Sequence, residues 1–205
     1  MQRTTVWSWL IGGLLLVGQS VLGVLSALAA RAGDAASVPL ELGAAVLVAA
    51  ACVVYAFGLR PEESVVARRP AGVVMLLSLG GFVLVRAAWW AGPTGYAVGA
   101  ELTAALSVIV AFLLAIGGAI AILRIGVIPR PWSWIPIAAI GLGLGLATMF
   151  AVATLVAPGA GGPVGVLPAS IPGVVGIISI VLAVTTQPSP ARPSASPAGA
   201  AVRHG

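Results

Sequence analysis

The chain has 205 residues, of which 60% are hydrophobic and only 7% carry a charge. Soluble domains carry about 25% charged residues, so this chain has too few polar side chains to cover a globule in water. Its net charge of +5 comes from ten basic residues, all of them arginines. They are spread between apolar runs rather than clustered with aromatic residues, which excludes a nucleic-acid-binding surface. The composition predicts a protein embedded in lipid, and arginine without lysine indicates a GC-rich bacterial genome.

Six apolar stretches approach or exceed the length of about 20 residues that a helix needs to cross a bilayer. They do not alternate between apolar and polar residues as barrel strands do. In lipid, a helix satisfies its backbone hydrogen bonds within the segment. The predicted fold is therefore all-α, a polytopic membrane protein whose six transmembrane helices form three hairpins. The predicted spans are residues 6–30, 40–59, 71–90, 100–123, 132–157 and 168–186.

The arginines in the short connections predict the orientation of the chain, because arginine in short loops favours the cytoplasmic side. With the N-terminus in the cytoplasm, Arg31 is the one loop arginine on the outer side, and the other loop and terminal arginines lie inside. The reverse orientation would place nearly all of them outside. We therefore predict cytoplasmic N- and C-termini in a multi-pass protein of the bacterial plasma (inner) membrane.

Tryptophans give a second, independent indication of the same topology. All six fall at the ends of predicted helices, where an indole joins an apolar ring to an N–H donor at the level of the lipid headgroups. They are predicted to be interfacial anchors. These residues are Trp7, Trp9, Trp89, Trp90, Trp132 and Trp134.

Three segments need separate interpretation. The apolar region after the N-terminus is longer than the 7–15 residues or so of a signal peptide, which favours a retained first helix, with a cleaved signal peptide as the alternative. Residues 158–170 are rich in Gly and Pro and fit either a loop or a re-entrant segment. Residues 1–186 are expected to form the helical bundle. Residues 187–205, rich in Pro, Ser and Ala, are expected to form a disordered cytoplasmic tail.

Arg86 is the one basic residue inside a predicted span, about 6 Å along the helix axis from the Trp89–Trp90 pair. Its side chain can reach the outer headgroups from a lipid-facing position. It can also pair with Glu101 at the start of the next helix, or with Glu41 as second candidate partner. Such a pair would act as a structural clasp or as an outer-side solute site, and these alternatives remain open.

Several uncharged residues add to this picture. Gln19, Ser78, Ser107 and Thr148 fall within the apolar spans. They are expected to form hydrogen bonds between helices, or else to line a polar path. Gly141 and Gly145 form a small-xxx-small pattern that predicts close helix packing.

The residues that most catalytic chemistry requires are scarce. The chain has a single histidine, His204, in the predicted tail, a single cysteine, Cys52, and no lysine. We therefore predict no metal site, cofactor or disulfide. Cys52 is expected to be a small buried hydrophobic residue. The segment 61–69 (PEESVVARR) is expected to be a solvated loop of mixed charge.

The sequence thus favours an integral membrane protein that is not an enzyme and acts as an interaction or accessory component. Its expected partners are the lipid bilayer and another membrane protein or a second copy of the chain. The alternative is a small-solute transporter or channel that uses Arg86, Glu101 and Glu41. A water-filled cavity from Arg86 toward Gln19 would favour transport, whereas a packed midplane would favour the accessory role. The sequence does not identify the substrate, the partner or the oligomeric state.

Overall fold

The computed structural model describes residues 7–59, 64–67, 69–92, 100–125, 133–156 and 167–185. Within the helices it does not describe the side chains of residues 100–105, 125, 147, 148, 150–156, 167 and 168. The described residues are helical apart from short turns. The helices are α1 (Trp7–Arg31), α2 (Ser37–Phe57), α3 (Pro70–Ala91), α4 (Ala100–Ile125), α6 (Ile135–Val156) and α7 (Leu167–Thr185).

These six helices confirm the predicted all-α class, and each begins and ends within a few residues of its predicted span. By length and composition, α1, α2, α3 and the Leu106–Arg124 part of α4 can each cross a membrane. Shorter described apolar stretches lie in α6 and α7. The chain therefore has the helices of a multi-pass membrane protein. The predicted tail, 187–205, lies outside the described residues, as does most of 158–170.

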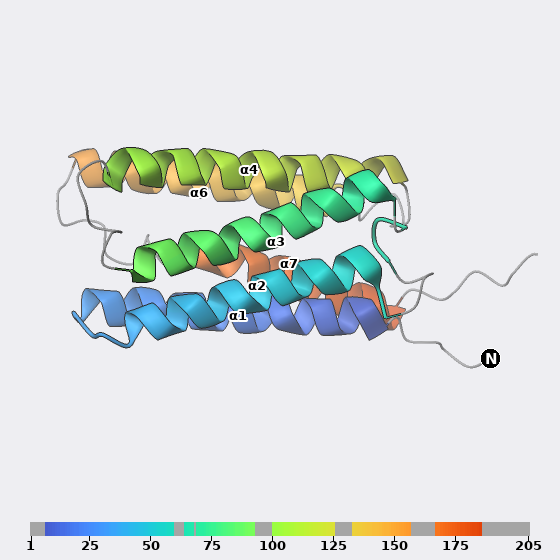
Figure 1. The fold of residues 1–205 in the computed structure, drawn as a ribbon, viewed down its shortest axis with the longest axis horizontal. Coiled ribbons are helices and arrows are strands. Elements are labelled where there is room, and N and C mark those ends of the chain that lie inside the picture. Colours follow the sequence, from blue (N-terminus) through green and yellow to red (C-terminus); the bar gives the residue numbers. More distant parts are fainter. Residues whose placement is uncertain are drawn as a thin grey trace, which may run out of the picture.

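The helices pack as a ring of antiparallel neighbours. α1 contacts α2 and α7 most extensively, and the ring continues through α3, α4 and α6 back to α7. In Figure 1, α1 and α2 lie on one side of the molecule, α4 and α6 lie on the other, and α3 and α7 lie between them. One end of the bundle, the Arg31 end, is where α1 and α3 finish and α2 begins. The opposite end, the Arg69 end, is where α3 begins and α4 finishes.

Glycines allow α1 to approach its neighbours closely. A Cβ atom on Gly13 would lie 2.6 Å from the carbonyl oxygen of Gly176 in α7, and one on Gly176 would lie 2.5 Å from the carbonyl oxygen of Gly13. Gly12, on the next position of α1, makes room for the ring of Tyr55 from α2, 2.6 Å from a Cβ placed there. Because apolar side chains gain little by leaving lipid, such backbone contact is a main source of packing energy between membrane helices.

The face of α6 that carries Gly141 and Gly145 was predicted to pack closely against another helix, but in the described part of the chain it does not. Both residues are exposed, and a Cβ on either would meet no atom within 4 Å. α6 is rotated so that Gly143 faces α7, 3.3 Å from the side chain of Ile171. Two residues correspond to about 200° around a helix, so Gly143 lies on nearly the opposite face from Gly141 and Gly145. The small-xxx-small face therefore makes no close contact with the described part of its own chain.

The turn after α2 folds back into the Arg69 end of the bundle. Ser64 and Val66 are 1% and 0% exposed. The hydroxyl of Ser64 donates a 2.6 Å hydrogen bond to the carbonyl of Ala56, and the N–H of Val65 donates to the carbonyl of Tyr55 at 3.1 Å. These bonds satisfy carbonyls that the end of a helix leaves without a partner.

The expectation of a solvated loop at 61–69 is therefore wrong for residues 64–66. Val65 packs in a buried cluster with Trp9, Leu182 and Ala183, and Val66 lies against Gly72 at the start of α3. Burying two valines and one internally bonded hydroxyl costs little, whereas the charged residues of this segment would be costly to bury. Residues 60–63 and 68, which include the two glutamates, lie outside the described residues.

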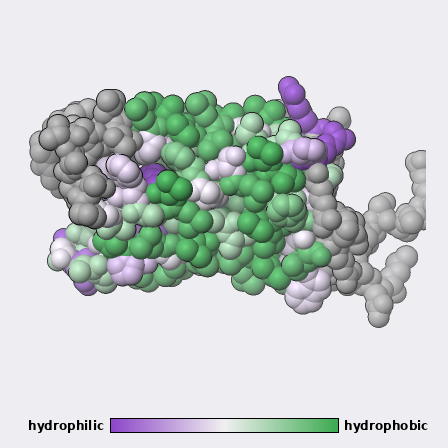
Figure 2. Space-filling view, viewed as in Figure 1, coloured by the Kyte–Doolittle hydropathy of each residue, from purple (hydrophilic) through white to green (hydrophobic). Residues whose placement is uncertain are grey.

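The outer surface of the bundle is apolar around its middle. Figure 2 shows a hydrophobic band across the molecule, with hydrophilic residues toward its two ends. Large aliphatic side chains such as Val74, Val85 and Leu113 are more than half exposed. A protein surrounded by water seldom exposes so extensive an apolar surface, whereas a protein surrounded by acyl chains requires one.

The close approach of α1 to α7 predicts a large effect of Gly13→Leu. The new side chain must displace the α7 backbone, and overpacking of this kind costs about 1–3 kcal/mol. We expect that loss in the free energy of unfolding, measured by titrating detergent-solubilised protein with a denaturing detergent. Gly81→Leu is the matched control, because among the described residues a Cβ on Gly81 meets no atom within 4 Å. Equal losses in the two variants would contradict the described helix contact.

Candidate functional site

The described side chains surround two separate hollows. The first, which we call the polar pocket, has a volume of about 240 Å³ and lies between α1, α2 and α3 around Ser26, Glu41, Arg86 and Trp90. The second, which we call the central cavity, has a volume of about 520 Å³ and is lined by residues from all six helices. The two hollows differ in chemistry and in their position along the bundle.

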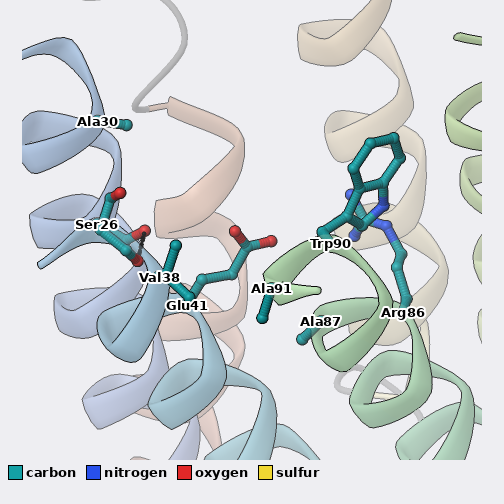
Figure 3. A pocket seen from close by; sticks show the side chains of 9 residues that line it. Ser26, Ala30, Val38, Glu41, Arg86, Ala87, Trp90 and Ala91 are labelled. Atoms are coloured by element: carbon teal, nitrogen blue, oxygen red, sulfur yellow. Dashed lines mark hydrogen bonds between the residues drawn. The ribbon is translucent and has the colours of Figure 1, made fainter. Parts of the chain in front are cut away.

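The polar pocket lies near the Arg31 end of the bundle. Arg86 is five residues before the last residue of α3, and Glu41 is four residues after the first residue of α2. Figure 3 shows the Glu41 carboxylate extending from α2 toward α3, and the Arg86 side chain extending along α3 toward Trp90. The Ser26 hydroxyl donates a 2.9 Å hydrogen bond to the Ser37 carbonyl, which joins α1 to the first residue of α2.

Arg86 therefore lines a pocket between helices, together with Glu41, one of its two predicted partners. Figure 3 shows no hydrogen bond between the two side chains. Arg86 Nε is buried and has no hydrogen-bond partner in the described part of the chain, while the Glu41 side chain is exposed. A direct Arg86–Glu41 clasp is therefore absent. The side chain of Glu101, the first predicted partner, lies outside the described residues.

The predicted mid-span polar residues whose side chains are described do not line a common hollow. Gln19 is partly buried and accepts a 3.4 Å hydrogen bond from the neighbouring Ser20 hydroxyl, but it lines neither hollow. Ser78 is exposed and lines neither hollow. Ser107 is partly buried and has a partner. The side chain of Thr148 lies outside the described residues.

The central cavity is almost entirely apolar. Side chains such as Leu76, Phe112 and Ile140 form most of its wall. The Ser179 hydroxyl, in the same wall, donates a 3.0 Å hydrogen bond to the carbonyl one turn earlier in α7. The Tyr55 hydroxyl is buried without a hydrogen-bond partner in the described part of the chain. The middle of the bundle is therefore hollow rather than fully packed, but its lining does not suit water or ions.

Cys52 also lines the central cavity and has a free thiol. It packs in a buried cluster with Ala56, Val66 and Leu76. This confirms its prediction as a small buried hydrophobic residue. Among the described residues, no group of three or more His, Cys, Asp or Glu side chains could hold a metal ion.

A packed layer of small residues separates the two hollows. Glu41 of the polar pocket and Val48 of the central cavity are about 10 Å apart along α2. Between them, Ala45 is 3% exposed. One turn further along α2, past Val48, a Cβ on Gly80 of α3 would lie 3.1 Å from the backbone of Ala49. α2 and α3 are therefore in close contact at the edge of the cavity, next to the cavity-lining residues Val48 and Leu79.

The predicted tryptophan anchors occupy three kinds of position. Trp7, Trp89 and Trp134 are exposed and lie at helix ends, where an interfacial indole belongs, whereas Trp90 lines the polar pocket. Trp9 is only 6% exposed, so its prediction as an anchor is wrong. It packs against the inward-folded turn after α2 and against the end of α7. Trp132 lies outside the described residues.

Three features of the two hollows were not predicted from the sequence. They are the Tyr55 hydroxyl, the Ser26–Ser37 bond and the position of Trp90 in the pocket. Tyr55 sits in an uninterrupted apolar run, so no local pattern distinguishes it. The preference of Trp90 for a helix end is visible in the sequence, but the face of the helix on which it lies is not.

Comparison of the chain with protein-family models, curated proteins and solved structures found no match.

The open volume of the central cavity predicts that Ala115→Phe is tolerated. Ala115 lines the cavity, so the added ring fills empty space, and filling a cavity commonly stabilises a protein by about 0.5–2 kcal/mol. Ala45→Phe is the matched variant in the packed layer and should lose about 1–3 kcal/mol by overpacking. Denaturing-detergent titration of both variants measures the difference. Equal destabilisation would show that the cavity is already filled.

Proposed function

We propose that the chain is a six-span protein of the bacterial plasma membrane, without catalytic chemistry, that acts as an interaction or accessory component. The observation that carries this proposal is the apolar lining of the central cavity. All six helices meet there, and a carrier or channel for a polar solute would place its polar residues there. The described charged side chains of Arg86 and Glu41 lie instead in the polar pocket near the Arg31 end. The Ser179 hydroxyl in the cavity wall bonds within its own helix.

Helix lengths support the six-span count. α6 has 22 residues and α7 has 19, and a helix of about 20 residues spans the hydrocarbon core. Pro172 lies inside α7, where neighbouring helices can compensate for the backbone bond that proline removes. With an even number of spans, the N- and C-termini lie on the same side of the membrane.

The described arginines support cytoplasmic termini. Arg69 precedes α3 and Arg124 lies in the last turn of α4, so both lie at the Arg69 end. Arg31 closes α1 at the opposite end. Arg86 lies inside α3 rather than in a connection or terminal turn. Without it, the Arg69 end carries two described arginines and the Arg31 end carries one, the bias expected if the Arg69 end is cytoplasmic. In this orientation the polar pocket faces outward.

An accessory component needs a surface for its partner, and α6 offers one. Gly141 and Gly145 are exposed one turn apart, which lets the backbone of another helix approach closely. A membrane-protein partner or a second copy of the chain would use this face.

A small-solute transporter remains a second candidate, favoured by the presence of Arg86 and Glu41 in one pocket. A transporter needs that pocket to connect with the other side of the membrane. The packed layer at Ala45 and Gly80 opposes such a connection, and transport would require α2 and α3 to separate.

The accessory role predicts that the chain, extracted from its own membranes in mild detergent, migrates on native gels as an assembly larger than one chain. The double variant Gly141→Leu, Gly145→Leu should migrate as a single chain, because the added side chains keep the partner helix away. Stability should not change, since a Cβ at either position meets no atom within 4 Å in the described part of the chain. Gly81→Leu is the exposed control on α3.

One pair of results would contradict the accessory role and favour transport. The wild-type chain would migrate alone, and its reconstituted vesicles would show solute flux that Arg86→Ala abolishes at unchanged protein abundance.

A further inference from the structure

The polar pocket places opposite charges on two helices without joining them. Glu41 extends from α2 and Arg86 from α3 toward the same hollow, and Figure 3 shows no hydrogen bond between them. Arg86 Nε is buried without a partner in the described part of the chain. The pocket between them has a volume of about 240 Å³, which is room for a small polar group.

The other described charges at this end already have partners. The Asp34 carboxylate accepts a 2.9 Å hydrogen bond from the N–H of Ala36 within the turn between α1 and α2. Arg31 also has a partner. Among the described residues of this end, Glu41 and Arg86 are therefore the charges available to a ligand.

A buried donor without a hydrogen bond destabilises a protein, and the penalty is larger near hydrocarbon. A ligand that supplies the missing acceptor removes this penalty. A guanidinium group binds carboxylate or phosphate through two parallel hydrogen bonds. A carboxylate such as Glu41 attracts an ammonium group, and an indole face such as that of Trp90 also favours a cation.

We propose that the polar pocket binds a small zwitterionic group, with its anionic end on Arg86 and its ammonium end between Glu41 and Trp90. A simple anion would leave Glu41 unpaired, and a simple cation would leave Arg86 unpaired. Only a ligand that carries both charges compensates both sides of the pocket. The proposal rests on the proposed orientation, in which the pocket opens at the outer headgroup level.

Two sources carry this chemistry. One is the phosphoethanolamine headgroup of a membrane lipid, which would enter from the bilayer. The other is a free amino acid, whose carboxylate and ammonium groups would enter from water. Both place an oxyanion on the guanidinium group and an ammonium on the carboxylate, so the experiment has to separate them by the route of entry.

The test measures the unfolding temperature of the full chain in lipid nanodiscs. The lipid arm compares phosphatidylethanolamine with phosphatidylglycerol, which has no ammonium group. The solute arm adds glycine or alanine to phosphatidylglycerol nanodiscs, with acetate and methylammonium as single-charge controls. We expect a higher unfolding temperature in one arm, with a response to the zwitterion that the single-charge probes do not reproduce.

The variants Arg86→Gln and Glu41→Gln should each weaken this binding at least tenfold. Arg124→Gln, at the other end of the bundle, should leave it unchanged. If Arg86→Gln does not fold, Glu41→Gln decides the question, because its side chain is exposed and its loss should not prevent folding. The absence of a shift in both arms, equal shifts with acetate or methylammonium, or binding unchanged in Glu41→Gln would overturn the proposal.

This test can fail independently of the proposed function. A chain that migrates alone on native gels but binds the zwitterion would contradict the accessory role and support the pocket. A chain that assembles through α6 but does not bind the zwitterion would support the accessory role and contradict the proposal for the pocket.

Discussion

The cost of placing charge in hydrocarbon governs the arrangement of this molecule. Each described charged side chain lies at a helix end, in a turn, or within two turns of a helix end, and the wide middle of the bundle is left to apolar residues. Because an ionised group in the bilayer core costs at least about 2.5–3.5 kcal/mol, a charge kept inside a helix needs compensation. Arg86 lies nearest to the core, and the polar pocket is where the molecule exposes it to a compensating group.

The small residues of the chain determine which helices can meet. Gly13 and Gly176 bring α1 and α7 into backbone contact, and Gly80 does the same for α3 against α2. These contacts close one half of the ring tightly, whereas α4 and α6 pack less extensively against their neighbours. The central cavity lies between these two halves, and its wall is mostly apolar because few of the described side chains that line it carry a polar group. The buried Ala45 lies on α2 between the polar pocket and this cavity, and the proposed zwitterion site concerns the pocket alone.

The positions of the helices could be predicted from the sequence because hydrocarbon thickness selects the length of an apolar run, and charged or Pro-rich connections mark where each run ends. The faces of the helices could not. In a soluble protein, polar residues mark the exposed face of a helix, but here lipid and bundle interior are equally apolar. For this reason Gly141 and Gly145 resembled a packing face, whereas the close contact is at Gly13 and Gly176.

The candidate site was predicted only in part, because an apolar sequence does not show which face of a helix meets the bundle interior and which meets lipid. The charges of Arg86 and Glu41 distinguish them in an apolar sequence, and the structure places them in one pocket. Trp9 and the turn at residues 64–66 were misread because a tryptophan at a helix end can face headgroups or pack inward. Valines beside charged residues can likewise be solvated or buried. Contacts between distant segments decide both cases, and Trp9 meets Val65 and Leu182 in one cluster.

Reaction of single cysteines with a charged, membrane-impermeant thiol reagent on intact cells tests the central claim most directly. Cys52 is the only cysteine of the chain and lines the central cavity, so it should remain unmodified. In a Cys52→Ser background, Val38→Cys, in the wall of the polar pocket, should react from outside the cell. Rapid modification of Cys52 would show that water reaches the middle of the bundle and would contradict the separation of pocket from cavity. Modification of Val38→Cys only after the cells are opened would contradict the orientation.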